Sequence, residues 1–367
     1  MLTAIKRPLK ALLLPKWRRK IREHFVSLNI THLYGPKRIR LSSNEAVVTC
    51  VVKNGEFYVE HFIRHYVQMG FRHIFFLDNG SSDQTIAIAK RHKNVSVCKS
   101  NLSIDGHQGL FKKYLAQRSA AGGWCLDADI DEFLDYPFSD VIGLRAFLEY
   151  LNGKHYSAVI TQLLDMFSDK PLSHLAKAQE EDVKAVYRYY DISEITKTQY
   201  DVSELVAQYG QGNDISNRDA ALYFGGIRKT LWGNNCLLTK HSLFLADKVE
   251  LFPHVHFVNN ARLADVSCVM LHYKLTSNAL DAAMQNRVGF RGISKGYNDC
   301  IDFLTREPNY LIKRSTAAAF RSVNDLVESD FLFISKDYRE YVSALAEGKV
   351  QADSPVRGGI SACSGRA

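Results

Sequence analysis

The apolar residues in the first third of the chain form short continuous runs that alternate with stretches of helical periodicity. Residues 46–52 are a continuous β-type run, typical of a strand buried on both faces, and residues 58–69 carry one apolar helical face that ends at Gly70. Strand patterns recur at 73–77 and 95–98, and helix patterns at 84–91 and 109–120. This alternation predicts an α/β fold with a mostly parallel, Rossmann-like sheet flanked by helices, which binds ligands beyond the carboxyl ends of its strands.

An acidic stretch interrupts the next apolar run. Residues 124–126 are apolar, and Asp127, Asp129 and Asp131 follow at alternate positions. If the chain is extended here, these three carboxylates point to the same side and need a cation to neutralise their repulsion. Oxygen-rich sites suit Mg²⁺ or Mn²⁺. The same spacing also fits an acidic turn that caps a helix starting near Phe133.

A second acid stands at an equivalent place in the predicted sheet. Asp78 directly follows the strand pattern of residues 73–77, as Asp127 follows that of residues 124–126. Because parallel strands end at the same edge of a sheet, the order of the chain predicts one pocket that contains both side chains.

The chain divides into four parts by its pattern. Residues 1–40 are a basic leader, and residues 41–275 hold the predicted sheet. Residues 276–350 show helical patterns and are predicted to form a C-terminal helical part. Residues 351–367 are rich in Gly and Ser and are predicted to be a disordered tail.

Charge is distributed unevenly between these parts. The net charge of the 367 residues is +8, yet eleven Lys and Arg stand before Leu41 against one acid, Glu23, so the rest of the chain is almost neutral. A basic segment with Leu and Trp anchors is typical of peripheral contact with an anionic membrane, and a solvated extension is the alternative. The neutral body argues against nucleic acid as a partner.

The cellular location follows from what the sequence lacks. The seven cysteines show no CxxC pair, and the apolar stretch at residues 11–14 is far shorter than a signal-peptide core or a membrane span. We therefore expect a cytoplasmic protein that contacts the inner face of the membrane.

The chain resembles a known family at several motifs in the same order. The sequence is similar to nucleotide-sugar-dependent glycosyltransferases of GT-A fold, in the bacterial branch of family 2 and family 92-like enzymes. The matching segments lie between residues 44 and 274, at 52–56, 60–66, 77–83, 127–133, 225–228 and 271–274. The resemblance implies that residues 41–275 are a catalytic domain. It implies a metal-dependent hexosyltransferase that moves a sugar from a nucleotide-diphosphate sugar to a glycan or lipid-linked acceptor, in cell-surface polysaccharide assembly.

The resemblance also assigns roles to residues of this sequence. It implies that Asp78 holds the nucleobase, Asp127 lies near the ribose, and Asp129 binds the metal ion together with His272. An imidazole ligand favours Mn²⁺ over Mg²⁺. Arg228, beside the Gly225–Gly226 turn, is placed to reach a phosphate of the donor.

The catalytic base is less well defined. Inverting enzymes of family 2 usually carry an acidic pair after the Gly-Gly turn, and no such pair follows Gly226 here. Asp131, Asp165 and His256 are the candidates for the group that takes the proton of the acceptor hydroxyl. The sequence leaves the choice between them open.

Two other functions remain as alternatives. One is a non-catalytic protein of the same fold that binds a nucleotide or a glycan. The other is a phosphatase of the haloacid dehalogenase type, which also ends a strand in Asp-x-Asp. That class carries its nucleophile near the start of the domain and follows it with Thr or Val, whereas here two βα units precede and Ile130 follows.

Overall fold

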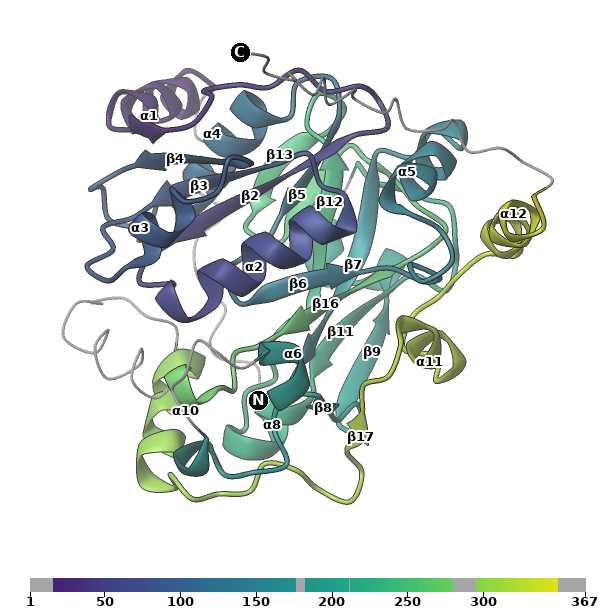
Figure 1. Cartoon of the computed structure of the whole chain (residues 1–367). Coiled ribbons are helices and arrows are strands. Elements are labelled where there is room, and N and C mark those ends of the chain that lie inside the picture. The colour runs from purple at the N-terminus through teal and green to yellow at the C-terminus, as the bar shows by residue number, and fades with distance from the viewer. Residues whose placement is uncertain (1–15, 176–181, 211, 280–294, 349–367) are drawn as a thin grey trace, which may run out of the picture.

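A computed structural model describes residues 16–175, 182–210, 212–279 and 295–348 (Figure 1). Its centre is a sheet of eleven strands: β1 (Thr31–Tyr34), β2 (Ala46–Val52), β3 (His73–Asp78), β4 (Val95–Lys99), β5 (Trp124–Asp127), β6 (Glu132–Asp135), β7 (Ala158–Asp165), β10 (Asp214–Ile215), β12 (Thr239–Leu245), β15 (Arg262–Leu263) and β16 (Cys268–His272). The predicted fold class, a mostly parallel α/β sheet flanked by helices, is confirmed. It is consistent with the Rossmann-like arrangement of GT-A enzymes.

The strands follow the order β1-β4-β3-β2-β5-β12-β7-β15-β10, and β16 pairs with both β7 and β6. Strands β4, β3, β2 and β5 run parallel to one another, as the predicted βα units require. Strand β12 is antiparallel to β5 and to β7, between which it lies. Its amino end therefore reaches the edge at which the parallel strands end.

Strand β12 also carries an irregularity in its pairing. Its register with β7 shifts between two pairs, Lys240 with Thr161 and Leu243 with Val159, so that β12 has one extra residue there. Such a bulge re-aims the side chains beside it. It lies next to the carboxylates that follow β5.

Helices cover both faces of the sheet: α2 (Glu56–Met69), α3 (Thr85–Ala89), α4 (Gln108–Ser119) and α5 (Leu144–Gly153). Val48 and Cys50 of β2 share a buried cluster with Phe62 of α2, whereas Val47 shares one with Phe111 of α4. Because successive side chains of a strand alternate, one apolar run serves both layers. The continuous hydrophobic pattern of residues 46–52 is explained by this double burial.

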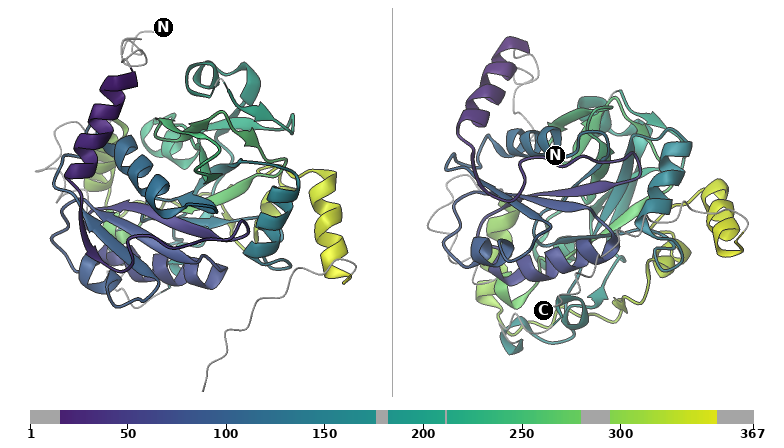
Figure 2. Two further views of the ribbon diagram at one scale, coloured as in Figure 1. Left: turned by 90° about the horizontal axis from the view of Figure 1, so that it is seen from above. Right: turned by 45° about the horizontal axis from the view of Figure 1, so that its top comes forward.

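The remaining elements are shorter or lie at the periphery: α1 (Lys16–Leu28), η2 (Leu172–His174), α6 (Val183–Val186), β8 (Tyr189–Tyr190), β9 (Ile195–Gln199), η3 (Tyr200–Val202), α7 (Glu204–Tyr209), β11 (Ala221–Gly225), α8 (Ile227–Trp232), β13 (Glu250–His254), β14 (Phe257–Asn259), α10 (Lys295–Arg306), β17 (Ala318–Ala319), α11 (Val323–Glu328) and α12 (Lys336–Ala346). Three two-stranded sheets join β11 to β9, β13 to β14, and β17 to β8. Figure 2 shows α1 projecting from the body.

The ends of the chain bear on the predicted division into parts. Strand β1 pairs with β4 at the sheet edge, so residues 31–34 of the predicted leader belong to the sheet. The predicted tail lies outside the described residues. No helix of the described residues has the length and hydropathy needed to cross a membrane. The domain boundaries themselves stay predictions.

A glycine turn leads from β11 into α8. Gly225 and Gly226 have φ angles of +87° and +66°, and a Cβ on Gly225 would lie 2.9 Å from the carbonyl oxygen of Glu194. Both the positive φ and the close approach require glycine. The turn starts α8, which carries Arg228 toward the sheet.

Candidate functional site

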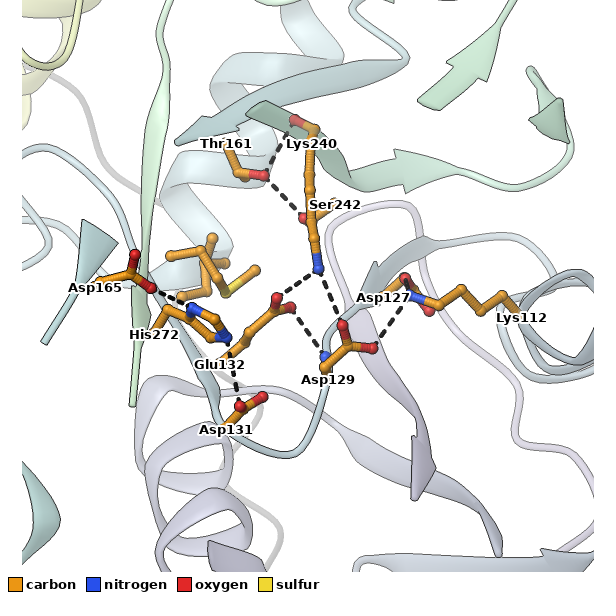
Figure 3. A network of polar contacts seen from close by, with 12 residues as sticks. Lys112, Asp127, Asp129, Asp131, Glu132, Thr161, Asp165, Lys240, Ser242 and His272 are labelled. Atoms are coloured by element: carbon orange, nitrogen blue, oxygen red, sulfur yellow. Dashed lines mark hydrogen bonds and ion pairs between the residues drawn. The ribbon is translucent and has the colours of Figure 1, made fainter. Parts of the chain in front are cut away.

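Three polar residues lie side by side across neighbouring strands at one edge of the sheet. His272, the last residue of β16, pairs with Asp165, the last residue of β7. On its other side His272 pairs with Glu132, the first residue of β6. The register of the sheet therefore brings together residues that are more than a hundred positions apart in the chain (Figure 3).

Two buried lysines hold the acids that follow β5, in a set of contacts that we call the lysine network. Lys112 Nζ of α4 lies 2.6 Å from Asp127 Oδ2 and 3.2 Å from Asp129 Oδ1. Lys240 Nζ of β12 lies 3.1 Å from Asp129 Oδ2 and also contacts Glu132 Oε1. Asp129 thus accepts from an ammonium group on each of its carboxylate oxygens.

The turn between β5 and β6 is closed by reciprocal hydrogen bonds. The backbone N–H of Asp129 donates to Glu132 Oε2 at 3.0 Å, and the N–H of Glu132 donates to the carbonyl oxygen of Asp129 at 3.0 Å. The extended chain expected through Asp131, with three carboxylates on one side, is therefore wrong. The alternative, a helix starting near Phe133, is also wrong because that residue lies in β6.

A second set of contacts, the histidine network, surrounds His272. Its Nδ1 lies 2.6 Å from Asp165 Oδ1, and its Nε2 lies 3.3 Å from Asp131 Oδ2. Arg228 donates to both oxygens of Asp165, from Nε at 2.6 Å and from Nη2 at 2.7 Å. A carboxylate thus faces each ring nitrogen and favours its protonation, whereas Arg228 Nη2, a donor 2.9 Å from Nδ1, favours a lone pair on that nitrogen.

The charges in these networks shift the pKa values of their members. Burial by itself lowers the pKa of His272, but Asp131 and Asp165 outweigh it and raise that pKa. Burial raises the pKa of Asp165, yet Arg228 and His272 bring it well below its usual range. In the same way Lys112 and Lys240 hold the pKa of Asp129 well below its usual range. Asp129, Asp165 and His272 are thus stabilised in their charged forms, whereas burial outweighs Lys112 at Asp127 and raises the pKa of that carboxyl group.

Only two carboxylates of the networks are substantially open to solvent. The side chain of Asp129 is 37% exposed and that of Asp131 is 22% exposed. Asp127 and Asp165 are buried, and so are both lysines. A ligand that approaches this edge of the sheet meets Asp129 and Asp131 first.

The predicted metal ligands, Asp129 and His272, belong to the two different networks. Both oxygens of Asp129 accept from ammonium groups, and both nitrogens of His272 face carboxylates. A metal ion needs a free lone pair on the imidazole, and Nδ1 already faces Arg228 Nη2 at 2.9 Å as well as Asp165, while Nε2 faces Asp131. In the described part of the chain, no three His, Cys, Asp or Glu side chains are grouped to hold a metal ion. This donor set does not fit a divalent cation.

Other predicted residues take positions that differ from their expected roles. Arg228, predicted to reach a phosphate, is buried and bonded to Asp165. Asp78 accepts from the N–H of Ser81 at 3.0 Å and so shapes the loop after β3. Alternation along β3 and β5 places Asp78 on the face covered by α2 and Asp127 on the face covered by α4. Their contacts with a nucleobase and a ribose stay predictions.

His256, a predicted base, lies beside the lysine network. Burial first, then Lys240, lowers its pKa well below the usual value, so its ring is neutral. Its Nδ1 is buried and has no hydrogen-bond partner among the described residues. A catalytic role for His256 stays a prediction.

The sequence patterns did not mark Lys112, Lys240 or Glu132 as site residues. Lys112 stands at helical spacing from the buried residues Leu115 and Ser119 of α4, so a lysine on the apolar face of a helix was the available signal. Lys240 lies in a strand whose first six residues are buried. Lysines at core positions are rarely found unless they are paired.

Comparison with known proteins shows only distant likenesses. No family model matches the chain, and no curated protein matches it in sequence. Among solved structures, TarS of S. aureus matches with a TM-score of 0.35 and 14% identity over 72% of this chain and 43% of that one. HddC of Yersinia pseudotuberculosis matches with a TM-score of 0.32 and 11% identity over 66% of this chain and 99% of that one.

A third solved structure is named for a nucleotide sugar. UDP-glucose pyrophosphorylase of Acinetobacter baumanii matches with a TM-score of 0.22 and 12% identity, over 42% of this chain and 66% of that one. The chain spans less than half the length of TarS, so the activity of that whole protein does not transfer to this one.

Proposed function

We propose that this protein is a glycosyltransferase that moves a sugar from a nucleotide-diphosphate sugar to a hydroxyl group of a glycan or lipid-linked acceptor. The observation that carries the proposal is the pair of partly exposed carboxylates, Asp129 and Asp131, backed by buried cations at the carboxyl edge of a mostly parallel sheet. In α/β sheets this edge is where ligands bind. A diphosphate and a hydroxyl group both need charged partners in the reaction.

The chemistry assigns a separate task to each network. The bond between the anomeric carbon and the diphosphate oxygen breaks, and the negative charge that develops on the diphosphate needs cations nearby. Lys112 and Lys240 supply two positive charges beside Asp129. The acceptor oxygen bonds to the anomeric carbon, and its proton passes to the carboxylate of Asp131. His272, held by Asp165, orients that carboxylate.

One feature favours a second candidate, a protein of this fold that binds a nucleotide or glycan without turnover. Although burial raises the pKa of Asp131, His272 outweighs it and lowers that pKa. A carboxylate with a lowered pKa is a weaker base. The two candidates differ in whether a bound donor is consumed.

Donor hydrolysis tests the proposal. The purified chain is incubated with a panel of UDP- and GDP-sugars, in EDTA and in Mn²⁺, and release of the free sugar is followed. We expect slow hydrolysis of one donor, which Asp129→Asn and Asp131→Asn each reduce by about 10²-fold or more. Asp219→Asn, at an exposed acid away from the networks, is the control. Binding of UDP or GDP without hydrolysis of any donor would favour the second candidate.

We further propose that α1 makes peripheral contact with an anionic membrane. Trp17, Ile21, Phe25 and Leu28 follow one another at helical spacing, and each is at least half exposed. The opposite side of α1 is fixed to the body, through Arg19 to Glu250 and through Lys113 to Glu23. The apolar stripe therefore faces outward, with Arg18, Lys20 and Arg22 beside it.

Sedimentation with vesicles tests this contact. The protein is expected to bind vesicles that contain anionic lipid, and binding should fall in neutral vesicles and in the Trp17→Ser/Ile21→Ser variant. Leu311→Ser, at an exposed leucine elsewhere, should leave binding unchanged. Equal sedimentation of the double variant and the wild type would contradict the proposed contact.

A further inference from the structure

The acids of the predicted metal motif already have cations in contact with them. Lys112 bridges Asp127 and Asp129 at 2.6 and 3.2 Å, and Lys240 bridges Asp129, at 3.1 Å, and Glu132. Figure 3 shows the two lysines approaching Asp129 from different elements. The place that a divalent cation takes in such a motif is thus reached by two ammonium groups of the protein itself.

Both lysines are anchored, as a permanent part of the site must be. Their side chains are only 2% and 5% exposed, and they come from α4 and β12, on two different elements of the fold. Taking an ammonium group out of water is unfavourable unless carboxylates compensate for it. Here each lysine has two carboxylate partners, so the sequence keeps both cations in the interior at these positions.

The charge of the lysine network differs from that of a metal site. When ionised, Asp127, Asp129 and Glu132 give the network a formal charge of −3. The two lysines bring the formal net charge to −1. A divalent cation would have to displace ammonium groups from both oxygens of Asp129, or lie close to two like charges. The other predicted ligand, His272, is engaged with Asp131 and Asp165.

The hydrogen-bonding capacity of the two lysines is mostly used inside the network. Each ammonium group has three N–H donors, and two of them are used by the carboxylates named above. The third N–H of each lysine is the group that a phosphate oxygen of the donor would have to reach.

We propose that Lys112 and Lys240 take the place of a divalent metal ion in this motif, and that the protein binds the diphosphate of its donor without one. The second half of the inference rests on the proposed glycosyltransferase function, whereas the first half concerns the motif alone. The two halves are tested separately.

Binding of Mn²⁺ to the full-length chain tests the first half. Mn²⁺ is titrated into wild type and Asp129→Asn, and free Mn²⁺ is followed by electron paramagnetic resonance. The inference predicts equal binding by the two proteins, because Asp129 holds no metal ion in the wild type. Tighter binding by the wild type, lost in Asp129→Asn, would overturn it. This comparison decides the matter even if the lysine variants fail to fold.

Removal of the two lysines gives the converse result. In Lys112→Gln/Lys240→Gln the three carboxylates lose their cations, and Mn²⁺ binding should tighten by about tenfold or more over wild type. Lys113→Gln, at the neighbouring lysine of α4 that contacts Glu23, is the matched control and should bind Mn²⁺ as the wild type does. A folded double variant with unchanged Mn²⁺ affinity would contradict the role of the lysines.

Calorimetry with UDP and GDP tests the second half. The affinity for the nucleotide should be the same in EDTA and in Mn²⁺, and should fall by about tenfold or more in Lys240→Gln. Binding that requires Mn²⁺ would overturn the inference and leave the glycosyltransferase proposal standing. Failure to bind either nucleotide, in either buffer, would contradict both the second half of the inference and the proposed function. The Mn²⁺ titration would still test the first half.

Discussion

The lysine network and the histidine network solve the same problem with different cations. Each keeps a partly exposed carboxylate, Asp129 or Asp131, in place through buried positive charge in contact with it. Lysine ammonium groups keep their charge over the whole range in which proteins are folded, whereas an imidazole gains and loses its proton near neutrality. The comparison indicates that one half of the site is insensitive to pH and the other half responds to it.

The largest effect should come from breaking the buried pair at the base of the histidine network. Asp165→Leu leaves Arg228 buried without its carboxylate and removes a partner of His272, and should lower the free energy of unfolding by about 3–5 kcal/mol. Urea denaturation measures the loss. The double variant Asp165→Leu/Arg228→Met buries no unpaired guanidinium group, so it should be closer to wild type. A single variant as stable as the double variant would contradict this account.

A smaller effect should distinguish the networks by pH. The pKa of His272 is raised above its ordinary 6.5, so its contribution to stability is complete below pH 6.5 and is lost as the pH rises through the folded pKa. Stability measured by urea denaturation should therefore fall from pH 6.5 toward pH 8.5. The lysines contribute nothing to this slope, because they do not titrate there.

His272→Gln is the control for that slope. It should be less stable than wild type at pH 6 and should lack the decline above pH 6.5. His65 and His241 do not cause the decline in stability above pH 6.5. Burial lowers their pKa values to about 3 and about 4, so both are already neutral in the folded state over that range. An unchanged slope in His272→Gln would show that another group titrates.

The acid limb of the stability profile should be common to both networks. The pKa values of Asp129 and Asp165 are lowered below the usual 3.8, so their contributions are present above that pH and are lost as the pH falls through the folded values. This limb offers no contrast between the networks.

The smallest effect on stability should come from the outer carboxylates. Asp129→Asn and Asp131→Asn should each lower the free energy of unfolding by about 1 kcal/mol or less, because solvent screens these partly exposed groups. Lys112 and Lys240 each keep another carboxylate partner in Asp129→Asn. Thermal denaturation measures the change. A large loss of stability would mean that these acids hold the fold rather than a ligand.

The sequence predicted the ends of strands better than the contacts between them. Asp78 and Asp127 were each expected where a strand pattern ends, and they are the last residues of β3 and β5. Apolar runs determine such ends because the strands are buried on both faces. The register that pairs His272 with Asp165 depends on β7 and β16, which lie far apart in the chain, so local patterns did not predict it.

Charged residues in the core were the main omission. Lys112 and Lys240 were not among the predicted site residues. The apolar face of α4 indicates burial of Lys112, but the sequence does not show which carboxylates lie opposite the two lysines. The expectation that Asp127, Asp129 and Asp131 point together failed for a related reason. The turn closed by Asp129 and Glu132 ends the extended chain, and His272 attracts Asp131 away from the lysines.

The bulge of β12 makes this site sensitive to changes in chain length. A deletion of one residue between Lys240 and Leu243 would restore regular pairing with β7. The side chains at the amino end of β12 would then point to the opposite face of the sheet, so that Lys240 no longer reached Asp129. Engineered insertions and circular permutants should therefore leave residues 238–245 intact. The turn after β12, near Asp247 and Lys248, is the safer location for a tag or a fused domain.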